Sequence, residues 1–251
     1  MTHKEIGHNF LARLGKKKLR PGGIEATDWL TEKGEFSKQT KVLEVACNMC
    51  TTSIELAKKY NCNITGIDLD SQALEKAKIN VKKTGLEDKI NVLQGNALKL
   101  PFDDNTFDIV INEAMLTMLS FKAKKKAIDE YYRVLKPGGK LLTHDVAYLN
   151  PELTQIFDEL SSTININVSP LSVTEWEEVF QQSNFSNVES TYGQMSLMSF
   201  KGMIRDEGFI NTLNIIKNGH KKKNREMFKN MHTFFTKTGK DLKYIAVCSQ
   251  K

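Results

Sequence analysis

The stretch KVLEVACNMCTTSIELAKKYNCNITGIDLD, residues 41–70, decides the fold. Its first five residues, 41–45, are an apolar run that predicts a short buried strand. A short loop leads into 51–60, where apolar side chains recur with helical spacing, and 63–70 has the composition of a second strand. A strand, a loop, a helix and a further strand together predict a βαβ unit with two parallel strands.

The same alternation continues to about residue 147. A helix is expected over 71–85, because its apolar residues share one face, Asp70 or Ser71 can cap its start and Gly85 can end it. Further strands are expected at 89–95, 107–114 and 140–146, and a further helix at 123–139. The region after about residue 150 has a looser pattern. It predicts a helix at 175–185, a strand at 187–197, mixed helix and turn at 203–237 and a closing strand at 243–250. The alternation predicts an α/β fold built on a parallel sheet.

Composition limits the class of protein. The chain has 251 residues, a formal net charge of +6 and four cysteines with no regular spacing, which is not typical of a secreted disulfide framework. No apolar run is long enough for a membrane span, and the first residues lack the apolar core of a signal peptide. We therefore expect a cytoplasmic protein with no membrane partner.

Ligands of parallel α/β sheets bind outside the carboxyl ends of the strands, so the residues there are the candidates for a site. Asp68 ends the second strand, where an acid can accept hydrogen bonds from both hydroxyls of a ribose. Asp70 can cap the following helix alone, which leaves Asp68 for a ligand. After the third strand, the Asn96 amide can read a purine edge and the Ala97 backbone N–H can donate to a ring nitrogen.

Taken together, VLEVACNMCTTSIELA, ITGIDLD, VLQGNALKLPFDDNTFDIVINEAML and YYRVLKPGGKLLTHDV resemble the class I S-adenosylmethionine-dependent methyltransferases, specifically the group that modifies small molecules. The resemblance implies a doubly wound, Rossmann-like sheet of seven strands, with the last strand antiparallel and helices on both faces. It also implies that residues 1–40 form an N-terminal lid on a cofactor-binding domain, residues 41–251.

The resemblance assigns a role to each strand end. It implies that Glu44 supports the first loop, Ala46, Cys47 and Asn48 approach the methionine part of S-adenosylmethionine, Asp68 holds the ribose, Leu69 lies beside the adenine, Asn96 and Ala97 read the adenine, and Asn112 and Glu113 lie near the sulfonium and the substrate. It implies no metal. S-adenosylhomocysteine is then the product.

The chain departs from the family pattern in the first loop. Ala46, Asn48 and Cys50 occupy positions that are normally glycine, and Asn96 stands where Asp is commoner. Asn tolerates a left-handed backbone better than other non-glycine residues, and Ala46 adds only a methyl group. Cys50 is the largest change, because it puts a thiol where the helix begins.

Cys47 and Cys50 also form a Cys-x-x-Cys, which is found in redox pairs and in zinc sites. A structural zinc site needs four ligands, and Cys62 and Cys248 do not form a second pair. We favour small residues replacing glycine in a packed turn, with the redox pair as the alternative. A dinucleotide fingerprint is set aside, since none of its glycine positions holds glycine.

Two further features bear on chemistry. His144, at the end of the fifth strand, is placed to accept a proton from a hydroxyl, thiol or amine during transfer, with a structural hydrogen bond as the alternative. The basic runs 16–20, 122–126 and 217–225 lack interleaved aromatic residues, so nucleic acid is not the expected partner. The middle run is interpreted as the solvated face of a helix.

The predicted function is transfer of the methyl group of S-adenosylmethionine to a nucleophilic atom of a small molecule by direct in-line displacement. Holding donor and nucleophile in line supplies much of the rate, so no catalytic base is obligatory. The alternatives are a cofactor sensor or inactive homologue, which binds S-adenosylmethionine without turning it over, and an RNA methyltransferase. The acceptor and the oligomeric state cannot be derived from these patterns.

Overall fold

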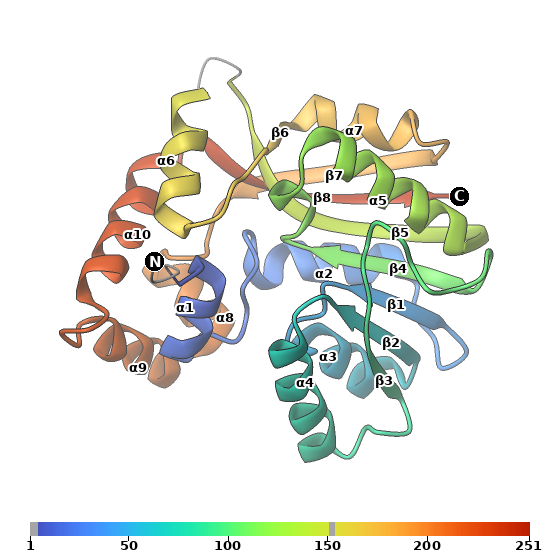
Figure 1. The fold of residues 1–251 in the computed structure, drawn as a ribbon, viewed down its shortest axis with the longest axis horizontal. Coiled ribbons are helices and arrows are strands. Elements are labelled where there is room, and N and C mark those ends of the chain that lie inside the picture. Colours follow the sequence, from blue (N-terminus) through green and yellow to red (C-terminus); the bar gives the residue numbers. More distant parts are fainter. Residues whose placement is uncertain (1–4, 151–153) are drawn as a thin grey trace.

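The strands of the protein form one sheet in the order β3-β2-β1-β4-β5-β8-β7, with a short strand β6 paired to the end of β5 (Figure 1). The computed structural model describes residues 5–150 and 154–251. The strands are β1 (Lys41–Val45), β2 (Asn63–Asp68), β3 (Ile90–Gln94), β4 (Phe107–Glu113), β5 (Leu135–Tyr148), β6 (Leu171–Ser172), β7 (Ser186–Gln194) and β8 (Leu242–Gln250). Strands β1 to β5 are parallel, and β8 runs antiparallel between β5 and β7. The predicted doubly wound sheet with an antiparallel last strand is confirmed, and β6 is an addition.

Helices cover both faces of this sheet. In chain order they are α1 (Gly7–Leu14), α2 (Gly23–Gly34), α3 (Thr51–Tyr60), α4 (Ser71–Thr84), the 3-10 helix η1 (Leu116–Met118), α5 (Phe121–Val134), α6 (Thr154–Ile164), α7 (Val173–Gln181), α8 (Phe200–Glu207), α9 (Phe209–Gly219) and α10 (Arg225–Thr238). Helices α5 and α7 pack on one face through side chains such as Tyr131 and Trp176, which are fully buried. Helices α2, α3 and α4 cover the other face. None of these helices is long and apolar enough to cross a membrane.

Local sequence explains the elements around β1 and β2. Helix α4 is capped at its start by the Asp70 carboxylate, which accepts from the backbone N–H groups of Gln72 and Ala73, and it ends at Gly85 in a left-handed conformation. Both ends lie where the sequence predicts them. Because Asp70 caps the helix, Asp68 is not needed for that purpose.

Five helices form a separate layer beyond the carboxyl ends of the strands, and we call α1, α6, α8, α9 and α10 the helical cap (Figure 1). The cap has a core of its own, made of Phe10, Leu11, Leu14, Met198, Met203, Ile215, Phe228 and Met231. The described part of the predicted lid, residues 5–40, is therefore divided between two layers: α1 belongs to the cap, whereas α2 packs against β5 and β8 of the sheet. The boundary at residue 40 stays a prediction.

The basic run at 122–126 contains one exception to the predicted solvated face. Lys124 is completely buried, and its Nζ donates to the backbone carbonyls of Leu116 at 2.7 Å and Ser169 at 3.0 Å. Its ammonium also lies 5.4 Å from the ring centroid of Trp176, and burial lowers the pKa of Lys124 to about 8. The interpretation as a solvated face was wrong for this residue, because its ammonium satisfies carbonyls of two loops that meet under α5.

Candidate active site

A cavity of about 610 Å³ opens at the carboxyl ends of the central strands, between the sheet and the helical cap. Nine of the ten side chains predicted for the cofactor line it: Glu44, Ala46, Cys47, Asn48, Asp68, Leu69, Asn96, Ala97 and Glu113. The cap and the segment before α2 contribute residues from the opposite wall, among them His8, Arg20 and Ile166. The sequence-predicted residues therefore meet at one cavity.

The loop between β1 and α3 keeps a left-handed backbone at every second residue without glycine. The φ angles are 57° at Ala46, 47° at Asn48 and 58° at Cys50. The left-handed region costs a residue with a Cβ roughly 1–2 kcal/mol, with Asn the most tolerant. The three glycine replacements therefore preserve the shape of the loop and leave it strained.

The Cys50 thiol is accommodated by a glycine on the neighbouring strand. A Cβ added to Gly66 in β2 would lie 3.0 Å from the Cys47 sulfur and 3.1 Å from the Cys50 sulfur. Both thiols are buried, and the hydrogen bond with Cys50, together with burial, raises the pKa of Cys47. A raised thiol pKa is the opposite of what a reactive redox cysteine needs, and residues 5–150 and 154–251 contain no group of three or more potential metal ligands. These observations favour the packing interpretation of the Cys-x-x-Cys.

Asp68 fixes the loop and still has room for a ligand. One carboxylate oxygen accepts the Asn48 backbone N–H at 2.9 Å, and the other accepts the Asp70 backbone N–H at 2.9 Å. A carboxylate offers about four lone-pair sites, so each oxygen can accept one more hydrogen bond. Because Asp68 lines the cavity, its two unused acceptor positions suit a pair of neighbouring hydroxyl groups.

The adjoining wall is apolar and open. Leu69 is 67% exposed although it is a large hydrophobic residue, and it lines the cavity next to Ala97. Asn96 accepts the Leu98 backbone N–H with its Oδ1 at 2.9 Å, which fixes the turn after β3. A flat ring that stacks on Leu69 would place the polar groups at its edge against the turn after β3.

Two buried carboxylates end neighbouring strands and have opposite properties. Glu44 accepts from the backbone N–H and the hydroxyl of Ser53, and burial raises the pKa of Glu44 to about 8. Glu113 is also buried, which by itself raises its pKa, but the Arg20 guanidinium and hydrogen bonds from His144 and Thr52 hold that pKa well below its usual range. Glu44 ties β1 to α3, whereas Glu113 carries a negative charge at the cavity.

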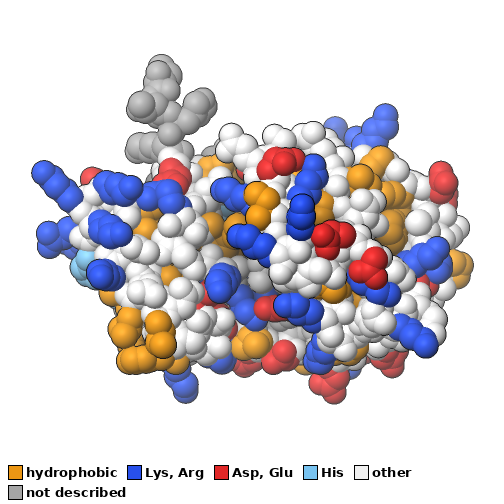
Figure 2. Space-filling model, turned by 90° about the horizontal axis from the view of Figure 1, so that it is seen from below, with side chains coloured by type: hydrophobic (Ala, Val, Ile, Leu, Met, Phe, Trp, Pro, Cys, Tyr) orange, Lys and Arg blue, Asp and Glu red, His pale blue; other side chains and the backbone are white. Residues whose placement is uncertain are grey.

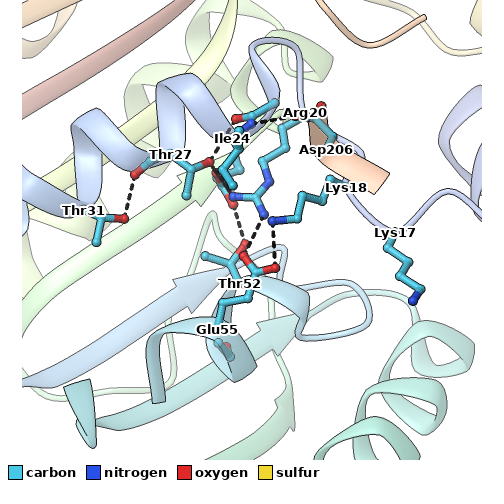
Figure 3. A network of polar contacts seen from close by, with 12 residues as sticks. Lys17, Lys18, Arg20, Ile24, Thr27, Thr31, Thr52, Glu55 and Asp206 are labelled. Carbon is cyan, nitrogen blue, oxygen red and sulfur yellow. Dashed lines mark hydrogen bonds and ion pairs between the residues drawn. The ribbon is translucent and has the colours of Figure 1, made fainter. Parts of the chain in front are cut away.

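Glu113 is the centre of a polar network that joins β4 to the segment before α2. Its Oε1 accepts from the Arg20 guanidinium at 3.2 Å and from the Thr27 hydroxyl at 3.1 Å, and its Oε2 accepts from the Thr52 hydroxyl at 2.6 Å. Arg20 also hydrogen-bonds Thr27 and lies 3.4 Å from Glu55. Figure 3 shows Arg20, Thr27 and Thr52 converging from three different segments.

His144 lies outside the lining of the cavity. It is completely buried, its Nε2 accepts the Gly22 backbone N–H at 2.9 Å and its Nδ1 lies 3.3 Å from Glu113. A neutral imidazole that accepts at Nε2 carries its proton on Nδ1, so it donates to Glu113. Both ring nitrogens are engaged with the protein, and the predicted role as a proton acceptor stays untested.

Asn112 is the tenth predicted cofactor residue, and the structure does not bring it to the cavity. Its side chain is completely buried in β4, level with Val45 and Thr143 on the neighbouring strands. Neither atom of its amide has a hydrogen-bond partner among the described residues. Its predicted position near the sulfonium stays a prediction that the geometry does not support.

A second, smaller cavity of about 80 Å³ adjoins the first on the side of the cap. Both cavities share His8, Leu19, Ala114 and Met118. The rest of the small cavity is mostly apolar: Ile6, Leu11, Val146, Leu160, Ile164, Val168, Met195, Leu197, Met231 and Phe235 all line it. These residues come from three separate stretches of the chain, 6–11, 146–168 and 195–235, so sequence spacing gave no signal for them.

Comparisons with known proteins agree with this geometry. Residues 42–139 match a family model described as a methyltransferase domain. The chain is 56% identical to an uncharacterized protein of Haemophilus influenzae, with all of both chains covered. It is 28% identical to a phosphoethanolamine N-methyltransferase of Plasmodium falciparum, over 70% of this chain and 65% of that one.

A solved structure of phosphoethanolamine N-methyltransferase 2 from Haemonchus contortus, in complex with S-adenosyl-L-methionine, has the same fold. It superimposes with a TM-score of 0.79 over 98% of this chain and 56% of that one. The two sequences are 17% identical, so this similarity shows the fold alone.

Proposed function

We propose that the chain, whose residues 42–139 match a methyltransferase domain, is a class I S-adenosylmethionine-dependent methyltransferase that transfers the methyl group of S-adenosylmethionine to a nucleophilic atom of a small molecule by direct in-line displacement. The observation that carries the proposal is the convergence of nine predicted residues on one cavity at the carboxyl ends of the strands. The complex of the Haemonchus contortus enzyme with S-adenosyl-L-methionine supports the same cofactor here.

The residues present suit this cofactor. Asp68 has two unused acceptor positions for the ribose hydroxyls, and Leu69 with Ala97 offers an apolar wall to the adenine. The left-handed loop at 46–50 borders the cavity with backbone and small side chains, which leaves space for the methionine part. When bound, S-adenosylmethionine supplies a methyl group on a positively charged sulfur.

Glu113 provides a charge that suits a sulfonium. Its carboxylate stays ionised because Arg20, Thr27, Thr52 and His144 all hydrogen-bond it, and it lines the cavity from the end of β4. We assign His144 to positioning: it holds the Gly22 N–H on one side and Glu113 on the other. This fixes the segment before α2 against β4, which closes the cavity.

The acceptor is proposed to enter the small apolar cavity under the helical cap. His8 is the titratable residue that lines both cavities, and burial lowers its pKa despite the nearby charges of Asp68 and Asp70. A lowered pKa keeps the imidazole neutral near pH 7, so a ring nitrogen is available to accept a proton. His8 is therefore a better placed proton acceptor than His144.

Calorimetry with S-adenosylmethionine and S-adenosylhomocysteine tests the cofactor. We expect saturable binding of both, and no heat with either at high protein concentration would contradict the proposal. A turnover assay over thiols, amines, phenols and carboxylates then tests the reaction through release of S-adenosylhomocysteine. Binding without turnover across this panel favours the alternative of a cofactor sensor, for which the strained, glycine-free loop is the supporting observation.

A further inference from the structure

Helix α9 carries apolar side chains on the face that points to solvent. Phe209 is 58% exposed, Ile210 76% and Leu213 45%, although residues of these types are normally buried. Ile210 and Leu213 are three residues apart, so they lie on the same side of the helix, and Phe209 stands next to them at its start. The three side chains form one exposed apolar group.

The fold does not need this group. The inner face of α9 already packs into the core of the helical cap through Ile215, and Thr212 and Gly219 on that face are buried too. A surface helix normally has polar residues opposite its buried stripe. Ile210 and Leu213 break this rule, and a contiguous exposed apolar patch marks an interaction surface.

The charges along α9 and in the turn after it are positive; the first exposed carboxylate beyond them is Glu226, and Glu5, which pairs with Arg13, also interacts electrostatically with Lys223. Lys217 lies one turn beyond Leu213, and the turn after α9 presents Lys221, Lys222 and Lys223, all exposed. Residues 208–225 contain no Asp or Glu, and the preceding acids, Asp206 and Glu207, have buried side chains. Figure 2 shows hydrophobic side chains gathered near the end of the molecule that holds α9, with Lys and Arg side chains around them.

We propose that this surface, which we call the α9 patch (Phe209, Ile210, Leu213, Lys217, Lys221, Lys222 and Lys223), binds the surface of an anionic lipid membrane. An apolar group flanked by lysines is the arrangement of interfacial segments, in which apolar side chains enter the boundary between headgroups and acyl chains while lysines meet the anionic headgroups. The proposal departs from the expectation of no membrane partner, which rested on the lack of a membrane-spanning segment, because an interfacial segment lies on the membrane surface and does not cross it.

Charge also favours a lipid membrane over two other partners of the α9 patch, a second copy of the chain and single-stranded nucleic acid. In a two-fold dimer built on this patch, the four lysines of each copy would lie near those of the other with no carboxylate from residues 208–225 between them. Single-stranded nucleic acid suits lysines interleaved with aromatic platforms, whereas the one aromatic side chain of the patch, Phe209, stands at the start of α9 and the lysines 221–223 follow its end. The anionic bilayer satisfies both the apolar and the basic part of the patch.

Co-sedimentation of the full chain with lipid vesicles tests the proposal. We expect binding to vesicles of equimolar phosphatidylglycerol and phosphatidylcholine, weakened by salt, and little binding to phosphatidylcholine alone. Replacing Lys221, Lys222 and Lys223 by Ser should weaken binding about 100-fold, since each lysine near an anionic surface contributes about fivefold. The double variant Ile210→Ser with Leu213→Ser should weaken it by about tenfold or more.

Matched controls come from α4, on the other side of the cofactor cavity. The variant with Ile79→Ser, Lys82→Ser and Lys83→Ser also removes one exposed apolar side chain and two exposed lysines, and it should bind vesicles like the wild type. Calorimetry with S-adenosylhomocysteine checks that each variant keeps its fold. This readout is independent of the membrane, so it separates a failure of this proposal from a failure of the proposed cofactor.

Three outcomes would overturn the proposal. The first is no binding to anionic vesicles, or equal loss of binding in the α4 control. The second is a wild-type dimer that the Ile210 and Leu213 variant converts to a monomer in sedimentation velocity, which would make the patch a contact between copies of the chain. The third is binding of a single-stranded RNA oligonucleotide through the lysines without binding of vesicles.

Discussion

The two walls of the cavity differ in how the chain builds them. The sheet wall comes from the ends of β1 to β4, between Glu44 and Glu113, and each of the nine predicted residues in it lies in the last two positions of a strand or in the loop that follows. The cap wall takes His8 and Arg20 from one end of the chain and Ile166 from far beyond the parallel strands, with Met195 and Met231 lining the smaller cavity beside it. The first wall is where we propose that the cofactor binds, and the second borders the space that we propose for the acceptor.

The joint between the walls is the ion pair of Arg20 and Glu113, and breaking it has the largest expected effect. Arg20→Ala leaves the Glu113 carboxylate buried without its cation, which should lower the free energy of unfolding by about 3–5 kcal/mol. Urea denaturation followed by circular dichroism measures this. Lys78→Ala, which breaks an exposed pair with Glu75, should stay within about 0.5 kcal/mol of the wild type. Equal losses of unfolding free energy in the two variants would show that the ion pair of Arg20 and Glu113 does not hold the two walls together.

Asp68 tests the sheet wall alone. Asp68→Ala removes the proposed acceptor of two ribose hydroxyls and the anchor of the Asn48 N–H, so the Kd for S-adenosylhomocysteine should rise by about 100-fold or more. The matched variant Asp70→Ala removes the cap of α4 and should cost about 1 kcal/mol of stability with little change in Kd. Calorimetry and thermal unfolding on both proteins give the comparison. If the two variants lose affinity equally, Asp68 acts only through the fold.

The sequence predicts the sheet wall because its signals are local. The strand β1 and the helix α3 have the predicted bounds, and α4 has the predicted caps, since period, caps and turn residues lie within a few positions of each other. The cap depends on contacts such as those of Phe10 with the cluster that holds Ile215 and Phe228, both about two hundred residues further along the chain. No periodic pattern encodes such pairs.

The same limit applies to the site. Arg20 belongs to the basic run 16–20, and its guanidinium pairs with Glu113 and Glu55, which lie in segments that no sequence spacing connects with this run. His144 and Asn112 lie near the carboxyl ends of their strands, as predicted, but their side chains do not line the cavity. A position near a strand end places the backbone of a residue and does not determine the direction of its side chain. Lys124 is buried, although it belongs to the basic run 122–126, which the sequence predicts to be exposed.

The two carboxylates Glu44 and Glu113, both in the sheet wall, respond to pH in opposite directions. The pKa of Glu44 is about 8 in the folded protein and near 4.5 when unfolded, so the folded state holds the extra proton between these values. Its contribution to stability is complete below about pH 4.5 and is lost as the pH rises towards 8. Glu113, with a lowered pKa, contributes above its ordinary pKa and loses this contribution as the pH falls.

Glu44→Gln isolates the first of these responses. The neutral amide keeps a hydrogen-bonding group beside Ser53 and cannot titrate, so stability should fall less between about pH 5 and pH 8 than in the wild type. Urea midpoints at several pH values in this window measure the difference between the two proteins. Parallel curves would mean that Glu44 is already ionised in the folded state and that its burial is offset by Arg20.

The smallest expected effect lies in the loop between β1 and α3. Ala46→Gly relieves a left-handed residue that has a Cβ but gives the unfolded chain more freedom, so we expect a net gain of about 0.5–1 kcal/mol. Asn48→Gly should be close to neutral, because Asn pays less for the same conformation. Thermal unfolding ranks the two variants, and calorimetry with S-adenosylhomocysteine shows whether the strain also affects binding. A loss of stability in Ala46→Gly would mean that the Ala46 methyl packs in the cavity wall more than it strains the backbone, and the sheet wall would then depend on side chains as much as the cap does.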